Sequence, residues 1–163
     1  MNPQKILVMS DSHGTVKYAL QAIEKEKPFD LLVHLGDVQG HDQEIVAAAG
    51  CSCYFVRGNC DYDMQLPTFT VFQIGNHKVY AAHGHRNHVE YGTENLEFSA
   101  LQNGCDIAMY GHTHVPDLRE KERITVLNPG SITSPRQNNP QRSYVVMTPD
   151  PDTGGINYEL KFL

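Results

Sequence analysis

Five short apolar runs, each followed by a turn, set the organisation of the chain. They are residues 5–9, 31–34, 53–56, 78–82 and 106–110. Short continuous apolar runs bounded by turns are typical of strands that are buried on both faces. We therefore predict five buried β-strands, each ending in a turn that contains glycine.

Helical patterns alternate with these runs. Apolar residues at spacings of four and three predict an amphipathic helix over 15–27 that ends before Pro28. A second helix is predicted over 43–49, with Asp42 as its N-terminal cap, and a third over 93–103. Strands that alternate with helices indicate an α/β protein with parallel strands.

The remaining strands are expected to be antiparallel. Residues 68–74 and 77–82 flank Gly75-Asn76, a turn suited to a hairpin. Further strands are predicted over 124–127, 142–148 and 156–162. Because no linker, low-complexity segment or fixed-period repeat interrupts the sequence, we expect a single domain spanning residues 1–163.

Length and cysteine content argue against a need for cross-links. A chain of 163 residues can bury ~70 % of the surface that it exposes when unfolded. The four cysteines lack the paired CxxC spacing of a structural zinc site. With no signal pattern and no apolar run approaching ~18 residues, the sequence predicts a reduced, cytoplasmic protein without a membrane segment.

The charge balance bears on the partners. The formal net charge is −6, and the few Lys and Arg residues form no cluster. Since proteins that bind nucleic acids usually carry a basic face, we expect no strong nucleic-acid binding. Bound cations can reverse the local field, so a small phosphoester remains compatible with this charge. Homo-oligomerisation stays open.

Potential metal ligands follow the end of each of the five runs. In chain order they are Asp11, His13, Asp37, Asn59, His83, His112 and His114. Ligands of open α/β sheets gather at the carboxyl ends of strands, so these side chains are expected to converge. The set combines nitrogen and oxygen donors without a thiolate, which favours Mn, Fe, Zn, Co or Ni over calcium.

The motifs DSH, GDV, GNCD, HGH and GHTH, in this order, resemble those of the calcineurin-like metallophosphoesterases. The short length resembles their compact phosphodiesterase branch in bacteria and archaea. The resemblance implies a four-layer α/β/β/α sandwich of two mixed sheets flanked by helices. It also implies two divalent metal ions that share Asp37. One ion would be held by Asp11, His13, Asp37 and His114, and the other by Asp37, Asn59, His83 and His112.

This resemblance implies a phosphoric ester hydrolase, with phosphodiester cleavage as the expected reaction. Two ions ~3.5–4 Å apart hold phosphate oxygens and lower the pKa of a bridging water, so that hydroxide can attack phosphorus in line. Manganese is the first expectation, with nickel, zinc, iron and cobalt as alternatives. The catalytic candidates are Asp37, Asn59, His83 and His85.

One departure from the family pattern affects proton transfer. Many members carry a histidine after the asparagine, where this chain has Cys60. That histidine is thought to protonate the leaving group or to hold phosphate. Whether Cys60 or His85 takes over this role stays open at this point.

Two other functions compete with a general phosphodiesterase. The retromer subunit of eukaryotes resembles this fold with a weakened metal site and works as a protein-interaction scaffold. Here all seven ligand positions hold competent side chains, which favours an enzyme. A nucleotide-directed phosphohydrolase would need a base-binding pocket, and the sequence has no insertion large enough to form a lid.

Other polar residues near strand ends have simpler interpretations. His34 is expected to pack at the end of its strand, and Cys51 and Cys53 to act as small buried hydrophobic residues. The segment 128–131, Asn-Pro-Gly-Ser, is typical of a tight turn. Family members often carry a similar loop near the metals, so this turn is a candidate support for the metal ligands.

Overall fold

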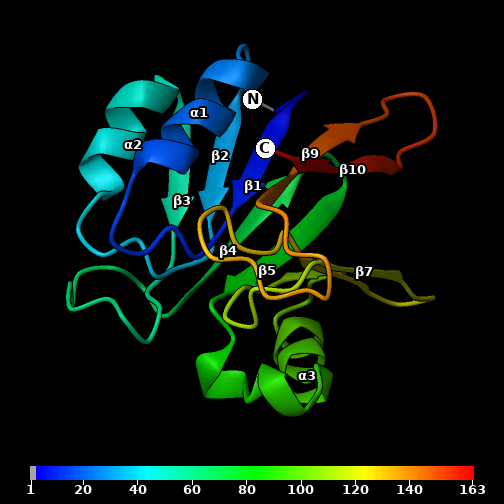
Figure 1. The fold of residues 1–163 in the computed structure, drawn as a ribbon. Helices are drawn as coiled ribbons and strands as arrows, with labels where there is room; N and C mark the ends of the chain where they lie inside the picture. Colours follow the sequence, from blue (N-terminus) through cyan, green and yellow to red (C-terminus); the bar gives the residue numbers. More distant parts are fainter. Residues whose placement is uncertain (1–2) are drawn as a thin grey trace.

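Two five-stranded mixed sheets pack face to face and carry helices on their outer faces, as the computed structural model of residues 3–163 shows (Figure 1). The first sheet has the order β10-β9-β1-β2-β3 and the second β4-β5-β6-β8-β7. Helices α1 and α2 cover the first sheet, and α3 covers the second. The predicted α/β/β/α sandwich is therefore confirmed.

The first sheet and its two helices come mostly from the N-terminal third of the chain. Its strands are β1 (Ile6–Met9), β2 (Leu31–His34), β3 (Ser52–Phe55), β9 (Ser143–Pro149) and β10 (Ile156–Phe162). The helices on its outer face are α1 (Lys17–Glu26) and α2 (Asp42–Ala49). Strands β1, β2 and β3 are parallel to one another, as predicted.

The second sheet lies between the first sheet and helix α3. Its strands are β4 (Phe69–Ile74), β5 (His77–Ala82), β6 (Ile107–Met109), β7 (Asp117–Glu120) and β8 (Thr125–Asn128). Helix α3 spans Glu94–Gln102, and two single-turn 3₁₀ helices, η1 (His85–Asn87) and η2 (Val89–Tyr91), precede it. The predicted hairpin is present as the antiparallel pair of β4 and β5.

Strand β1 explains why its sequence is apolar without interruption. Ile6 and Val8 face the layer between the two sheets, whereas Leu7 and Met9 face the layer beneath α1 and α2. All four side chains are fully buried. A strand covered on both faces needs apolar residues at every position, because neither face meets water. This placement brings the carboxyl end of β1 to the centre of the molecule.

Two predictions about strands need correction, and one strand was missed. Strand β3 is only half-buried, because it forms the edge of its sheet and one face meets solvent. Strand β8 pairs parallel with β6, so the later strands are not uniformly antiparallel. Strand β7 was not predicted at all. Its sequence, Asp-Leu-Arg-Glu, has no apolar run, and it becomes a strand by pairing with β8.

The predicted cap of α2 is also wrong. Asp42 is the first residue inside the helix, and the N-cap position belongs to His41, which makes no side-chain capping bond. The carboxylate of Asp42 instead accepts a hydrogen bond from the Gln43 side chain. A carboxylate in the first turn still stabilises the helix through the macrodipole. Across residues 3–163, the helices are too short or too polar to cross a membrane.

A buried carboxylate ties helix α1 to the C-terminal hairpin. Glu26, at the end of α1, is 3 % exposed and accepts hydrogen bonds from the hydroxyl of Tyr144 (2.7 Å) and from Lys161 (3.1 Å). Lys5 lies 3.3 Å from the same carboxylate. Burial raises the pKa of Glu26, but the hydrogen bonds from Tyr144 and Lys161 outweigh it and the pKa is lowered overall. The carboxylate is therefore ionised and fully partnered.

We predict that Glu26 and Tyr144 are energetically coupled. Glu26→Leu should lower the free energy of unfolding by about 1–3 kcal/mol, because the buried Tyr144 hydroxyl loses its acceptor. The double variant that also carries Tyr144→Phe should lose less unfolding free energy than the two single variants lose together, as measured by urea unfolding. The control Glu24→Ala removes an exposed carboxylate from the same helix and should cost under about 1 kcal/mol. Additive effects would contradict the coupling.

Candidate metal centre

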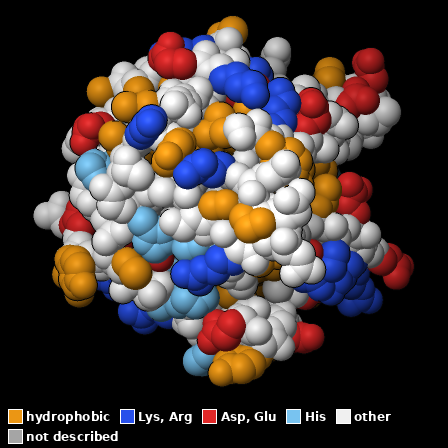
Figure 2. Space-filling model, viewed as in Figure 1, with side chains coloured by type: hydrophobic (Ala, Val, Ile, Leu, Met, Phe, Trp, Pro, Cys, Tyr) orange, Lys and Arg blue, Asp and Glu red, His pale blue; other side chains and the backbone are white. Residues whose placement is uncertain are grey.

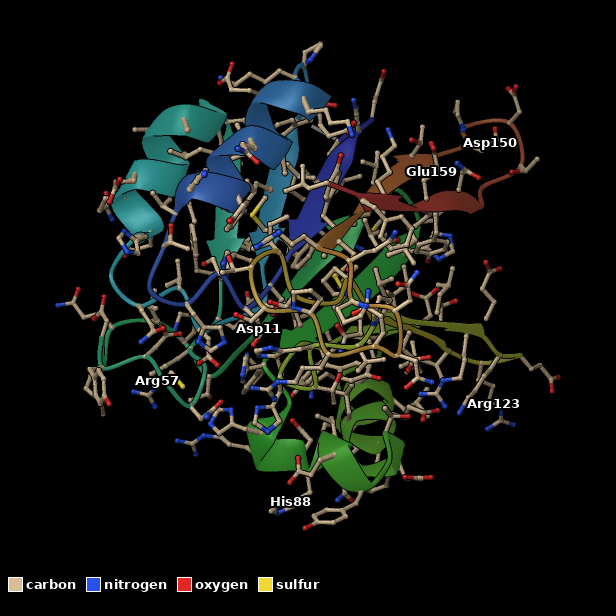
Figure 3. The ribbon with its side chains drawn as sticks, viewed as in Figure 1. Asp11, Arg57, His88, Arg123, Asp150 and Glu159 are labelled. Carbon is tan, nitrogen blue, oxygen red and sulfur yellow. The ribbon has the colours of Figure 1, made fainter. Side chains whose placement is uncertain are left out.

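The seven predicted metal ligands come together where five strands end. Asp11 and His13 follow β1, Asp37 follows β2, and Asn59 follows β3. The second sheet supplies the rest: His83 follows β5, and His112 and His114 follow β6. Figure 3 places Asp11 at this edge, and Figure 2 shows histidine side chains gathered on the same face of the molecule. The predicted convergence of these side chains is present.

The backbone at these ligands is strained. Asp11, His13 and Asp37 have φ of 57°, 53° and 57°. His112 and His114 have φ of 70° and 61°. For a residue with a Cβ the left-handed region costs roughly 1–2 kcal/mol, and such strain is concentrated at functional sites.

This strain corrects one expectation of the sequence analysis. If β1 ran on, Asp11 and His13 would share a face through strand alternation. Instead the strand ends at Met9, and left-handed residues in a turn aim both side chains at the cluster. The turn is fixed by backbone bonds, since the N–H of Asp11 donates to Gly36 O (3.0 Å) and that of His13 to Asp37 O (2.8 Å).

Asp11 lies at the bottom of the cluster and is completely buried. Its Oδ2 accepts hydrogen bonds from Ser10 Oγ (2.5 Å) and from the N–H of His112 (3.1 Å). Its Oδ1 has no hydrogen-bond partner. This oxygen lies 3.2 Å from His114 Nε2 and 3.7 Å from His13 Nε2. A buried carboxylate oxygen that faces imidazole nitrogens could hold a metal ion.

Asp37 occupies the middle of the cluster. Its Oδ2 lies 3.2 Å from His83 Nε2 and 3.8 Å from His13 Nε2. Its Oδ1 accepts a hydrogen bond from the N–H of Cys60 (2.8 Å). Asn59 Oδ1 lies 3.1 Å from His83 Nε2 and adds a neutral oxygen donor on this side. Asp37 thus faces histidines of both expected ligand sets.

Hydrogen bonds fix the tautomers of two histidines. His83 Nδ1 lies 2.6 Å from Leu35 O, and His114 Nδ1 lies 2.7 Å from Ser134 O. A carbonyl oxygen only accepts, so each Nδ1 carries the proton and each neutral ring presents a bare Nε2 to the cluster. His13 Nε2 lies only 3.1 Å from His114 Nε2. Two imidazole nitrogens that approach each other in this way are suited to hold a cation between them.

The electrostatics agree with this interpretation. Burial raises the pKa of Asp11 and of Asp37, but the adjacent imidazoles of His114 and His83 respectively outweigh it, and both values are lowered. Burial lowers the pKa of His83, but its bond with Asp37 and the charge of Asp11 raise it overall. Two ionised carboxylates therefore face imidazoles that can hold either protons or metal ions. Acid competes with metal for these nitrogens.

Asp61, to which sequence reasoning gave no role, supports the Asp37 loop. Its carboxylate is buried and accepts hydrogen bonds from the N–H groups of Asp37 (2.8 Å), Gly58 (2.8 Å) and Gln39 (2.7 Å). These bonds join the turns after β2 and β3. Its place in the GNCD motif, beside a ligand, was the signal that could have identified it.

The turn 128–131 also supports the ligands. Asn128 Nδ2 donates to Gly111 O (3.1 Å), and Ser131 Oγ donates to Asp11 O (2.8 Å). Ser131 Oγ further accepts from the N–H of Ser134, whose carbonyl holds His114.

His34 is fully buried as expected, between Ser12 Oγ (2.9 Å) and the N–H of Gly36 (3.2 Å). Burial lowers the pKa of His34 to about 4, so this ring is neutral.

Two side chains stand beside the ligands. The Sγ of Cys60 is within 4.8 Å of ligand atoms of His13 and Asp37, in line with its place directly after Asn59. Burial and the charge of Asp37 raise the pKa of this thiol. The His85 ring lies 5.4 Å from that of His83, and its Nδ1 is buried without a partner. Burial and the charge of His83 lower the pKa of His85 to about 4.

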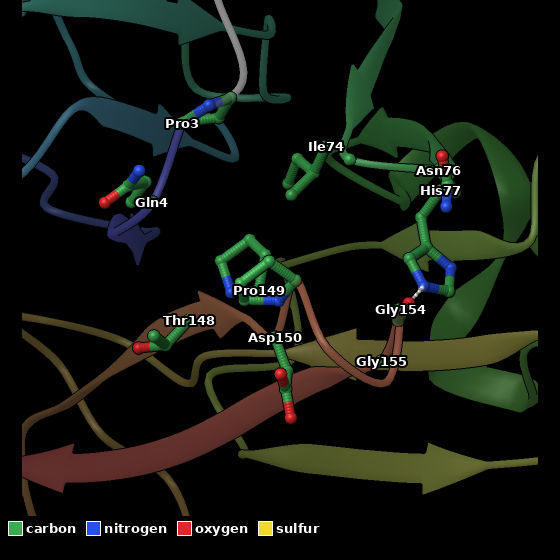
Figure 4. A pocket seen from close by; sticks show the side chains of 12 residues that line it. Pro3, Gln4, Ile74, Asn76, His77, Thr148, Pro149, Asp150, Gly154 and Gly155 are labelled. Carbon is green, nitrogen blue, oxygen red and sulfur yellow. Dashed lines mark hydrogen bonds between the residues drawn. The ribbon is translucent and has the colours of Figure 1, made fainter.

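A cavity of about 450 Å³ lies away from the strand-end cluster, and none of the seven candidate metal ligands lines it (Figure 4). Pro3 and Gln4, which precede β1, line it together with the β4–β5 turn and the β9–β10 loop, so it opens at the opposite end of the sheets. His77 lines this cavity, and both of its ring nitrogens are hydrogen-bonded, Nδ1 with the Asp106 carboxylate (2.7 Å) and Nε2 with Gly154 O (2.7 Å). The strand-end cluster is therefore the candidate active site.

Fold and cluster together define a class of proteins that bind metals at the strand ends of a two-sheet sandwich. A model of the calcineurin-like phosphoesterase superfamily domain matches residues 5–152. The chain belongs to this superfamily. Hydrolysis of phosphoesters with divalent metal ions is the chemistry of this family, and the donor set described above fits such ions.

Similar proteins come from bacteria and archaea, which confirms the resemblance to the compact branch. The probable metallophosphoesterase YsnB of Bacillus subtilis is 30% identical over 155 residues, which cover 94% of this chain and 89% of YsnB. Phosphodiesterase YfcE of Escherichia coli is 29% identical over 160 residues, which cover 83% of each chain.

Solved structures share the fold over the whole length. A predicted phosphoesterase from Streptococcus pneumoniae has a TM-score of 0.79 at 26% identity and covers 100% of this chain and 99% of its own. Zinc-bound Vps29 from Entamoeba histolytica has a TM-score of 0.76 at 22% identity, with 97% of this chain and 98% of that chain covered. At this identity, the similarity to Vps29 shows only that the two proteins share a fold.

We predict that the close approach of two turns is required for metal binding. A Cβ at Gly58 would lie 2.1 Å from Asp37 Oδ1 and 2.4 Å from Asp37 N, so Gly58→Ala must displace this carboxylate. Disturbing the support of a ligand typically weakens metal binding by ~10–100-fold, which Mn²⁺ titration calorimetry would measure. Gly14→Ala is the matched control, because no atom lies within 4 Å of a Cβ there. Equal affinities of the two folded variants would contradict the prediction.

Proposed function

We propose that the protein is a dinuclear metal-dependent phosphodiesterase, with a small phosphate ester as its substrate. The observation that carries this proposal is the position of Asp37. One carboxylate oxygen faces His83 Nε2 at 3.2 Å and His13 Nε2 at 3.8 Å, two residues of different expected ligand sets. A carboxylate between two such sets is suited to bridge two ions. The phosphodiesterase name of the Escherichia coli relative supports the reaction.

The ligands divide into two sets that share Asp37. Asp11, His13 and His114 would complete the first set, and Asn59, His83 and His112 the second. Divalent ions at such a site polarise phosphate oxygens and lower the pKa of a water nucleophile. Manganese is our first choice among the ions that suit nitrogen and oxygen donors, with Ni, Zn, Fe or Co as alternatives.

Neither Cys60 nor His85 is a strong general acid for the leaving group. The raised pKa of the Cys60 thiol makes it a poor proton donor to an alkoxide. His85 has a pKa of about 4, so at neutral pH it is an uncharged ring that can donate an N–H hydrogen bond to a phosphate oxygen. We assign His85 to substrate phosphate rather than to protonation of the leaving group.

One prediction of the proposed function concerns metal stoichiometry. After reconstitution with manganese, elemental analysis should approach two equivalents per chain. Asp37→Ala should lose far more than half of this metal, because one carboxylate serves both ions. His114→Ala, which removes a ligand of one set, should lose about one equivalent. If the parent chain binds a single ion and Asp37→Ala keeps it, the bridging role of Asp37 is wrong.

The second prediction concerns the leaving group. General acid catalysis contributes a factor of ~10²–10⁴, so its absence should penalise esters with basic leaving groups most. Aryl diesters such as bis-p-nitrophenyl phosphate should react much faster than alkyl diesters. A plot of log kcat against leaving-group pKa should have a steep negative slope, and Cys60→His should make it shallower. A shallow slope in the parent chain would show that another residue donates the proton.

A protein-binding scaffold is the second candidate function. It is favoured by exposed apolar side chains in the loop that follows Asn59, where Tyr62 is 90% and Met64 is 79% exposed. The two functions separate in one screen. Chelator-stripped protein is loaded with each metal in turn and assayed on phosphate monoesters and diesters. Metal-loaded protein that hydrolyses none of them would favour the scaffold.

A further inference from the structure

We propose that Glu90 is a positioning residue for His112, which it orients so that the ring presents Nδ1 to the metal centre. This inference rests on the proposed function and names a residue that the family motifs do not contain. Glu90 lies in η2, between the His83 turn and helix α3. His88, labelled in Figure 3, marks this segment of the chain.

His112 faces the cluster with the opposite nitrogen from its neighbours. His83 and His114 donate through Nδ1 to backbone carbonyls and turn Nε2 inward. In His112 it is Nδ1 that points inward, 3.1 Å from Asn59 Oδ1. Its Nε2 points outward and lies 3.5 Å from Glu90 Oε2. The carboxylate of Glu90 therefore stands where the other two rings have a carbonyl.

The two nitrogens of His112 compete for one proton. Both Asn59 Oδ1 and Glu90 Oε2 are acceptors, and a neutral ring can satisfy only one of them. The 3.5 Å separation between Nε2 and Glu90 Oε2 is an ion-pair contact rather than a hydrogen bond, but the negative charge of Glu90 still favours a proton on the nearer nitrogen, Nε2. Glu90 thus raises the fraction of rings with the proton on Nε2, which leaves the lone pair of Nδ1 free for a metal ion.

A buried anchor holds Glu90 in place. Its neighbour Val89 is 5% exposed and belongs to the apolar cluster beneath α3. A Cβ at Gly84 would lie 2.8 Å from Val89 Cγ2, so only glycine at position 84 lets Val89 dock there. Because Gly84 directly follows His83, the segment that supplies one ligand also supports another. The backbone of His88, with φ of 53°, turns the chain at this point.

The size of the effect follows from the exposure of the pair. Residues that orient metal-binding histidines typically contribute ~10–100-fold in metal affinity. The side chain of Glu90 is 41% exposed and that of His112 26%, so solvent screens their interaction. We therefore expect the lower end of this range, about tenfold.

The experiment compares Glu90→Ala, Glu90→Gln and the control Glu122→Ala, which removes an exposed carboxylate from the turn between β7 and β8. Long-range ¹H–¹⁵N spectra of the metal-free proteins at pH 8 report which nitrogen of His112 is protonated. Zn²⁺ titration calorimetry reports the affinity of each ion. Glu90→Ala should raise the Nδ1–H fraction and weaken one of two zinc ions about tenfold. Glu90→Gln keeps an acceptor oxygen, so its Nδ1–H fraction and its zinc affinity should lie between those of Glu90→Ala and the parent chain. Glu122→Ala should match the parent chain in both measurements.

The outcomes are distinct. An unchanged tautomer ratio in Glu90→Ala would overturn the proposal, as would an equal loss of zinc affinity in Glu122→Ala. The tautomer measurement needs neither metal nor turnover. If the parent chain hydrolyses no ester but Glu90→Ala still shifts the His112 proton, the proposed function fails while the role of Glu90 stands.

Discussion

Two buried carboxylates that require cations determine the architecture of this protein's strand-end cluster. Asp11 is fully buried and Asp37 nearly so, and Asp11 Oδ1 has no hydrogen-bond partner. An isolated ionised carboxylate is costly to bury, so it must be paired or bind a metal. Imidazoles from both sheets converge on these oxygens. The two sheets must therefore keep a fixed register at this edge.

The strained backbone follows from the same requirement. Side chains on five different strands can reach one point only if the turns after the strands redirect them. Left-handed residues at Asp11, Asp37 and His112 make this change of direction within one or two positions. Backbone bonds between turns and the carboxylate of Asp61 hold these conformations. The apolar layer between the sheets, which includes Val8 and Ala81, supplies the rigid base.

The surrounding groups determine which nitrogen each histidine offers. Carbonyls of Leu35 and Ser134 fix two rings in one tautomer, whereas His112 has a carboxylate at its outer nitrogen. An imidazole must be neutral to bind a metal ion, so these outer contacts influence which nitrogen each ring can offer to one. Proton transfer is less well provided for. Cys60 has a raised pKa and His85 a lowered one, which is the basis of the proposed preference for esters with good leaving groups.

The sequence by itself indicated an α/β protein and its metal-ligand candidates, and the resemblance of its motifs to a known family implied the sandwich. Continuous apolar runs identified the strands buried on both faces, and the polar residues directly after them identified the metal-ligand candidates, because the points along the chain where strands end are set by local sequence. Only the tertiary structure decided the rest. Strand β7 has a polar sequence and exists through its pairing with β8, and the half-exposed face of β3 follows from its place at the sheet edge. The left-handed turns hold the backbone against its local preference. The contacts of Asp61 with Asp37 and of Glu90 with His112 join residues that are far apart in sequence. Such contacts depend on distances across the folded molecule, which no local pattern of residues contains.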